Sequence, residues 1–236
     1  MDKYQILAIV LGIILLLVII VLTSRTRIFK TYQKYLKIGN KANLTGKQLA
    51  FISKQNLELG NLQFAMTETP LGDAYSPKYQ TLILSEEVCN TASLSSLTIV
   101  AHELGHAQQH KQNTGLFFIN QLLTKITLFT NKLILPLLII GLLLFILKYP
   151  NEELGSTLMI ISGCLFLFHA MNQILTIPLE YDASKRALKY LKDYNYVSPS
   201  EYRRAKKLLS IAAQTYIANL LDGLFVFNKK KKRKKK

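Results

Sequence analysis

Three long apolar runs constrain the fold of this 236-residue chain more than any other feature. The first, Tyr4–Thr23, has about the 20 residues that a helix needs to cross the hydrocarbon core of a membrane. It continues directly into the basic sequence SRTR at residues 24–27, without the small-residue cleavage site of a signal peptide. The run therefore predicts an uncleaved transmembrane anchor over residues 1–24 rather than a secretory signal.

Two further apolar runs, Ile126–Leu147 and Gly155–Ile177, lie in the second half of the chain. A turn-like segment with a proline and an asparagine, KYPNEEL at residues 148–154, separates them. Because both runs are near the length of a membrane span, they predict a transmembrane hairpin over residues 126–177. The alternative is a pair of core helices buried inside a soluble domain.

The distribution of lysine and arginine predicts which side of the membrane each segment faces. Seven basic residues and no acidic residue lie between Ser24 and Ala50, whereas the hairpin loop has one lysine beside Glu152 and Glu153. Since basic segments stay on the cytoplasmic side, residues 25–125 and 178–228 are expected in the cytoplasm and the amino terminus outside.

The cytoplasmic segments contain signals for helices and short strands. Thr45 is a candidate cap for a first helix, and Ser93 or Ser95 for a second. Two capped helices and two alternating strands are expected, over residues 45–56, 93–112, 61–66 and 79–84. The predicted fold class is therefore a mainly α membrane protein, with about three transmembrane helices and a small α/β cytoplasmic part.

The C-terminal segment Leu208–Phe227 is apolar on one side only. A small or polar residue recurs at every fourth position: Ser210, Gln214, Ala218 and Asp222. This period predicts an amphipathic helix rather than a fourth span. A fourth span would also place the basic tail outside.

Half of the net charge of +16 belongs to the polybasic tail Lys229–Lys236. Such a tail beside an apolar helix is expected to bind anionic lipid head groups. It has no interleaved aromatic residues, so no specific nucleic-acid recognition is expected. Two cysteines, Cys89 and Cys164, are too few for a disulfide scaffold.

Residues 102–106 have the sequence HELGH, and a helix places His102 and His106 one turn apart on one face. This spacing lets two imidazoles bind one zinc ion. Glu103 lies beside His102, where its carboxylate can take a proton from a zinc-bound water. The alternative is a pair of helix-surface histidines without a metal.

A catalytic zinc site needs a third protein ligand. His110 continues the four-residue spacing, but about 12 Å of helix separates it from His102, too far to share one ion. Glu180, in the sequence IPLEYDASKRA, is the preferred third ligand, on a helix that Pro178 can open. The alternative for Glu180 is an ordinary carboxylate near a helix N-terminus.

These motifs resemble the YugP-type neutral zinc metallopeptidases, a family of small bacterial membrane proteins. The matching stretches, in order, are LTGKQLA, AYSPKYQTLILSEEV, SLTIVAHELGHAQQH, TIPLEYDASKRALKYL and SPSEYRRAKKLLSIAAQTYIA. They cover most of the chain outside the first anchor and the tail. The resemblance implies zinc at His102 and His106, Glu103 as catalytic acid and base, and Glu180 as the third ligand.

The chain departs from related patterns at several polar positions. In HtpX-like membrane proteases, a carboxylate four residues after the ligand glutamate orients a zinc-bound histidine, and here that position is Ser184. Asp182 follows Glu180 by two residues, about 160° around the helix from that position. Asp73 and Tyr75 have no assigned role. His169, near the end of the third run, is either functional or a hydrogen-bonded residue of the helix pair.

The sequence thus predicts a membrane-embedded zinc endopeptidase of the gluzincin type, multi-pass in the bacterial cell membrane, with one zinc ion per chain. Glu103 would take a proton from the water nucleophile and return it to the leaving amine. The strand at Tyr79–Leu84 can pair with an extended peptide, and the expected substrates are peptides or membrane proteins. The alternative is a membrane protein that binds metal without catalysis. The oligomeric state is not predicted.

Overall fold

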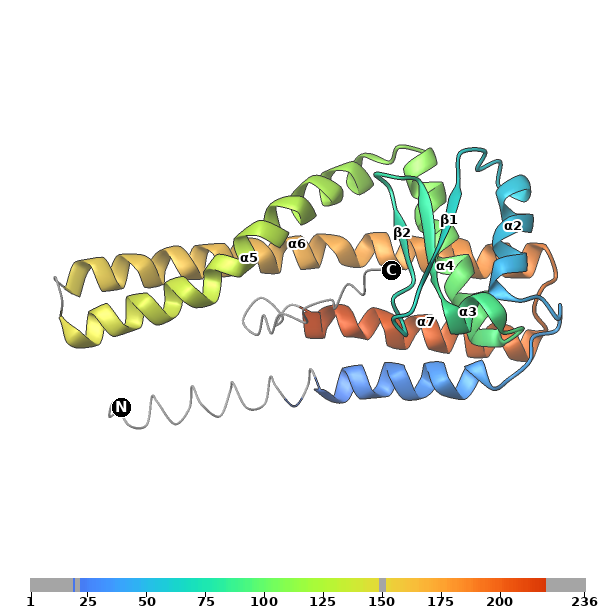
Figure 1. The fold of residues 1–236 in the computed structure, drawn as a ribbon, viewed down its shortest axis with the longest axis horizontal. Coiled ribbons are helices and arrows are strands. Elements are labelled where there is room, and N and C mark those ends of the chain that lie inside the picture. The colour runs from blue at the N-terminus through green and yellow to red at the C-terminus, as the bar shows by residue number, and fades with distance from the viewer. Residues whose placement is uncertain (1–18, 20–21, 149–151, 220–236) are drawn as a thin grey trace, which may run out of the picture. The chain divides into compact units, whose positions relative to one another are not determined.

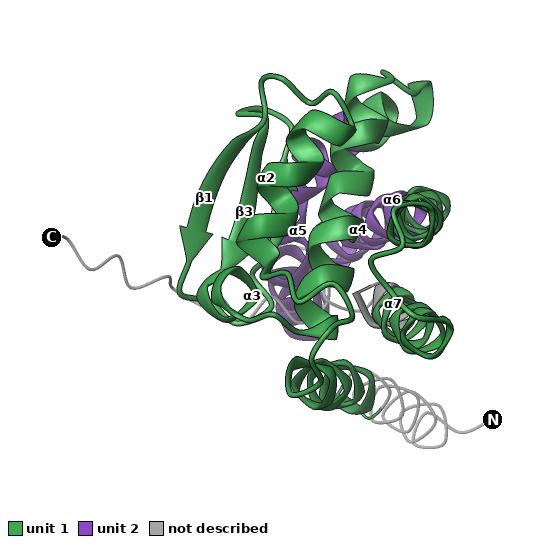
Figure 2. Cartoon of the chain, turned by 90° about the vertical axis from the view of Figure 1, so that its right-hand side faces the viewer, with its two compact units in different colours: residues 1–120, 175–218 green, residues 121–174, 219–236 purple. Residues whose placement is uncertain are grey.

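The computed structural model describes residue 19, residues 22–148 and residues 152–219 (Figure 1). Nearly all of the predicted first span, the basic tail and the end of the predicted amphipathic helix lie outside these residues. The chain divides into two compact units, coloured separately in Figure 2. Unit 1 comprises residues 1–120 and 175–218, and unit 2 comprises residues 121–174 and 219–236.

Unit 1 contains the predicted capped helices. Thr45 caps α2 through a reciprocal hydrogen-bond pair with Gln48, and Ser93 caps α4 by accepting from the Ser96 amide. Both caps confirm the sequence signals. The helices of unit 1 are residues 22–36, α2 (Gly46–Asn56), α3 (Glu86–Asn90), α4 (Leu94–Lys111) and α7 (Pro199–Asn219).

The sheet of unit 1 has three strands, β1 (Gln63–Thr67), β2 (Ala74–Ser76) and β3 (Thr81–Ser85), in the order β1-β3-β2. β3 pairs with β1 in parallel and with β2 in antiparallel register. The strands expected at 61–66 and 79–84 are present with shifted ends, and β2 lies inside the expected loop. Because β3 is the central strand, the prediction that it pairs with substrate is wrong; the free edges belong to β1 and β2.

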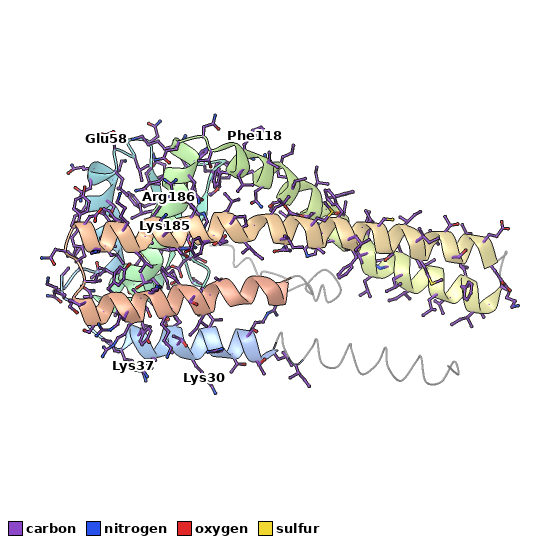
Figure 3. All side chains as sticks on the ribbon, turned by 180° about the vertical axis from the view of Figure 1, so that it is seen from behind. Lys30, Lys37, Glu58, Phe118, Lys185 and Arg186 are labelled. Atoms are coloured by element: carbon purple, nitrogen blue, oxygen red, sulfur yellow. The ribbon has the colours of Figure 1, made fainter. Side chains whose placement is uncertain are left out.

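One hydrophobic core joins the elements of unit 1. Leu49 of α2, Leu82 of β3 and Leu97 and Leu104 of α4 are completely buried. Tyr32 also lies in this core; its hydroxyl donates to Glu87 Oε2 and its carbonyl accepts from Ser95. The helix of residues 22–36 is thereby fixed to α3 and α4. Its basic residue Lys30 is exposed, as is Lys37 just beyond it (Figure 3).

Two long helices contribute to both units, α5 (Gly115–Leu147) and α6 (Glu152–Asp193). Among the described residues, they are the two helices long and apolar enough to cross a membrane. In their most apolar windows only 11% of α5 and 17% of α6 is buried inside the protein. This exposure disfavours the alternative of core helices in a soluble domain.

Unit 2 is formed by the adjoining ends of these helices. Gly141 and Gly155 allow close approach, since a β-carbon on Gly155 would collide with the backbone of Phe145. Ser162 Oγ donates to the Ile134 carbonyl at 2.8 Å, and Asn172 donates to Thr127 Oγ1 at 3.2 Å. These two polar contacts therefore join the two helices of the predicted hairpin. His169 is also buried here and lies outside the metal-binding group described below.

The sequence predicted that Pro178 opens a helix, and this prediction is wrong. Pro178 lies inside α6. Proline lacks an amide hydrogen and removes one helical hydrogen bond, which usually favours a position in the first turn. Here the helix continues through it, so the third apolar run and the segment with Glu180 form one element. α7 has Leu208, Leu209 and Ile211 buried and Ser210 exposed, in agreement with an amphipathic helix.

Candidate metal centre

Helix α4 presents the two histidines of HELGH in the predicted orientation. His102 and His106 lie one turn apart, with ring centroids separated by 4.8 Å and planes nearly perpendicular. Most of the rest of α4 is buried, so the rings occupy the remaining partly accessible face. The buried residues of α4 therefore determine which way the two histidines point.

A close helix contact brings the third candidate ligand to this face. Gly105 of HELGH lies against Ala183 of α6, and a β-carbon on Gly105 would be only 2.6 Å from the Ala183 carbonyl oxygen. A side chain there would have to move backbone, which is costly. Glycine at position 105 therefore lets α6 approach closely enough for Glu180 to reach both histidines.

The three side chains fit a zinc ion. Glu180 Oε2 is 3.1 Å from His102 Nε2 and 3.4 Å from His106 Nε2. Two ligand atoms of a tetrahedral zinc site, each about 2.0–2.2 Å from the ion, lie roughly 3.4 Å apart. The candidate ligand atoms of all three residues lie within 4.8 Å of one another, and no other group of this kind occurs among the described residues.

The electrostatics of the centre favour an anionic glutamate. Burial alone would raise the pKa of Glu180, but hydrogen bonds and charge from His102 and His106 outweigh it and hold that pKa well below its usual range. Burial alone would lower the pKa of His106, whereas the hydrogen bond and charge of Glu180 raise it to about 9. In the metal-free centre Glu180 thus stays ionised and pairs with a protonated His106 at neutral pH. A bound metal ion would take the place of the proton on His106 Nε2, which leaves two neutral ligands and one negative ligand.

Gln109 orients His106 through the ring nitrogen Nδ1, and no sequence signal pointed to this residue. Its Oε1 lies 3.0 Å from His106 Nδ1, while its Nε2 donates to the Leu179 carbonyl and to Asp182 Oδ2, both at 2.9 Å. Because these two donor contacts fix the amide, the oxygen faces the imidazole and accepts from Nδ1–H. That tautomer leaves His106 Nε2 free for a metal.

Asp182 and Ser184 take different positions around the histidines. Asp182 contacts neither histidine; its Oδ2 accepts from Gln109 and from Arg186 Nε, the latter at 2.6 Å. Arg186 and its neighbour Lys185 are labelled on α6 in Figure 3. Ser184 Oγ lies 3.3 Å from His102 Nδ1. Asp182 therefore acts on His106 through Gln109, and Ser184 is the direct but weaker partner of His102.

Strand β2 holds Glu103. The backbone amide of Tyr75 donates to Glu103 Oε2 at 2.8 Å, and Glu103 is almost fully buried. Asp73 anchors the start of this strand by accepting from the amide and hydroxyl of Ser85. Burial raises the pKa of Asp73, and these hydrogen bonds oppose the increase. The short strand β2, which the sequence predicted to be part of a loop, thus positions the Glu103 carboxylate.

His110 is not part of the group of three, as the helix geometry predicted. Its Nδ1 lies 2.7 Å from the Tyr75 hydroxyl, and its ring packs beside Phe117. Burial raises the pKa of Tyr75 to about 12, so the phenol keeps its proton at neutral pH and can donate to His110. His110 therefore belongs with β2 rather than with the candidate ligands.

Comparison with known proteins places the chain in a family. The family model described as "Putative neutral zinc metallopeptidase" matches residues 9–229. The chain is 27% identical over 205 residues to "Putative membrane protease YugP" of Bacillus subtilis (strain 168), covering 86% of each chain. No solved structure matches. The similarity supports a protease-like function, and the residues of the centre fit the zinc that the family implies. Because the family match covers residues 9–229, nearly the whole sequence, this chain belongs to the neutral zinc metallopeptidase family.

Proposed function

We propose that the chain is a membrane zinc peptidase in which His102, His106 and Glu180 hold one zinc ion and Glu103 transfers protons. The observation that carries this proposal is the convergence of two imidazoles and one carboxylate at zinc-ligand spacing. Glu103, on the same helix, lies beside this group and is held by the amide of Tyr75.

A bound zinc ion would supply Lewis-acid chemistry, lowering the pKa of a water molecule and polarising the scissile carbonyl. Glu103 would accept a proton from the attacking water and deliver it to the leaving amine. The Tyr75 amide holds Oε2 of Glu103, which restricts how the carboxylate can turn. Gln109 and Ser184 would keep the two imidazoles in the orientation that binds metal.

The membrane setting bears on the substrate. Glu180 follows the third apolar run by three residues within one helix, so the centre would lie near a membrane surface. The basic residues of unit 1 favour the cytoplasmic surface, with the protein multi-pass in the bacterial membrane. Peptides or membrane-protein segments reaching that surface are the proposed substrates. The tail Lys229–Lys236 is proposed to bind anionic lipid.

Metal analysis combined with peptide cleavage tests this function. Detergent-purified wild type should contain about one zinc per chain and hydrolyse an unstructured protein such as casein. Glu180→Ala should lose zinc, and His110→Ala should retain it. Glu103→Gln should retain zinc while cleavage falls by about 10²–10⁴-fold, the usual contribution of a general base.

Three results would contradict the proposal. Cleavage by Glu103→Gln at the wild-type rate would show that Glu103 is not the general base. Zinc bound by wild type at full occupancy, with no cleavage of any peptide or membrane-protein substrate, would favour the alternative of a metal-binding protein without catalysis. Retention of zinc by Glu180→Ala together with its loss from His110→Ala would overturn the choice of third ligand.

A further inference from the structure

A cavity of about 230 Å³ lies in unit 1 between α4, β2 and the segment that joins α2 to β1. Leu59, Leu62 and Ala107 supply much of its apolar lining. Lys111 and Glu58 line it as well and form an ion pair at 3.2 Å. Pockets for drug-sized ligands have about 300–1,000 Å³, so this cavity suits one side chain rather than a whole small molecule.

The cavity adjoins the proposed metal centre through two shared elements. On α4, Ala107 directly follows His106, and His110 lies one turn further; both line the cavity. On β2, the ring of Tyr75 lines the cavity while the amide of the same residue donates to Glu103 Oε2 at 2.8 Å. A substrate side chain in the cavity would therefore contact the ring of Tyr75, the same residue whose backbone amide holds Glu103.

β2 offers a free edge along which an extended peptide can bind. β3 covers its other edge, with Tyr75 opposite Leu82. The Tyr75 amide points to Glu103, hence away from β3, and in an antiparallel pair the carbonyl of the same residue faces the same way. The Tyr75 carbonyl therefore remains to accept from the main chain of a bound peptide. The side chains of that peptide would alternate between the two faces of the sheet, and those on the face of the Tyr75 ring would point toward the cavity.

We infer that this cavity is the subsite for one apolar side chain of the substrate, adjacent to the scissile bond. The inference rests on the proposed function, and it adds what that function lacks, a source of sequence preference. The apolar lining selects a leucine-, methionine- or phenylalanine-sized side chain, and Tyr75 and His110 form the side toward the metal centre. Burying such a side chain gives roughly a tenfold or greater preference over alanine.

Gly60 allows the cavity to be filled without disturbing the fold. It lines the cavity, and a β-carbon built there meets no atom within 4 Å. Gly115 has equally open surroundings and does not line the cavity. Gly60→Leu is therefore the test variant and Gly115→Leu its matched control.

Binding to the Glu103→Gln protein tests the subsite independently of hydrolysis. The chain has no tryptophan, so a tryptophan at one end of a model peptide, excited selectively, reports binding without tryptophan emission from the protein. In a peptide series with one varied position, leucine or phenylalanine should bind about tenfold more tightly than alanine at the position that enters the cavity. Adding Gly60→Leu should abolish that difference, and adding Gly115→Leu should preserve it.

The outcomes separate the two proposals. Equal affinity for leucine, phenylalanine and alanine at every position overturns the subsite, as does a preference that survives Gly60→Leu. Cleavage of the same peptides by the protein with Glu103 intact then tests the peptidase function separately from the subsite. If peptides bind with the expected preference but are never hydrolysed, the subsite stands and the peptidase function fails.

Discussion

The two parts of α6 differ in what covers their apolar residues. In residues 152–174, Ile160, Leu167 and Met171 are each more than 60% exposed. In residues 175–193, a regular stripe at four-residue spacing is buried: Leu179, Ala183, Ala187 and Leu191. One continuous helix therefore has an apolar surface without protein cover in one part and a packed stripe in the other.

This difference would let one helix contribute both to a membrane span and to the proposed metal centre. α6 has 42 residues, about twice the 20 needed to cross a hydrocarbon core. The exposed part suits lipid, since lipid tails cover apolar side chains at no cost in hydration. The packed part has Ala183 where Gly105 of α4 approaches, and Glu180 lies three residues before this alanine.

The largest expected effect is on chemical labelling at the two ends of α6. If residues 152–174 span the membrane, Glu153→Cys and Lys192→Cys should lie on opposite sides. In a background without Cys89 and Cys164, an impermeant maleimide should label Glu153→Cys in intact cells. Lys192→Cys should react only after permeabilisation, because the basic segments are expected inside.

Lys41→Cys provides the control for this experiment. It is exposed in unit 1 and should behave as Lys192→Cys does. Labelling of both ends of α6 from the same side would mean that this helix does not cross the membrane. Labelling of Lys41→Cys in intact cells would place the metal centre outside.

Local signals in the sequence predicted the apolar helices and the starts of two helices in unit 1. Runs of apolar residues identified the exposed parts of α5 and α6, and Thr45 and Ser93 identified two helix starts. Helix geometry also separated His110 from the candidate ligands. These features depend on neighbours within a few residues, which a sequence displays directly.

Features that depend on distant contacts were missed or wrong. Gln109 acts on His106 only because Asp182, 73 residues later, and Leu179 fix its amide. β2 has three residues, too few for an alternating pattern, and its place at the sheet edge depends on how β1 and β3 pair. Pro178 suggested a helix start from a local rule, although the helix runs through it.

The next prediction compares close helix contacts in the two units. Gly105→Ala should force α4 and α6 apart and weaken zinc binding by roughly 10–100-fold, since Glu180 would lose its distance to the histidines. Gly155→Ala should disturb the hairpin of unit 2 without changing zinc affinity. Chelator competition measures both, and equal zinc affinity in the two variants would refute the role of the Gly105 contact.

Overpacking at Gly105 should also lower the stability of unit 1 by about 1–3 kcal/mol. Thermal unfolding of metal-free protein measures this separately from zinc binding. A loss of zinc affinity much larger than the loss of stability would indicate that the helix spacing matters chiefly for the ligands. Unchanged unfolding would contradict the collision with the Ala183 carbonyl.

The smallest expected effects distinguish the partners of the two histidines. Gln109 lies 3.0 Å from His106 Nδ1 and is fixed by two further hydrogen bonds, whereas Ser184 lies 3.3 Å from His102 Nδ1. Gln109→Met keeps the length of the side chain but removes the acceptor, and should reduce zinc affinity by roughly 10–100-fold. Ser184→Ala should reduce it by less than about tenfold, because the longer contact orients the ring less firmly.

Asp182→Asn sharpens this last comparison. The amide can still accept from Gln109 but loses the charge that holds Arg186, so its effect should lie between those of the other two variants. Unfolding of the metal-free proteins serves as the control, since a purely structural role would lower stability and zinc affinity together. If Ser184→Ala weakens zinc binding more than Gln109→Met does, His102 rather than His106 is the histidine whose orientation limits the site.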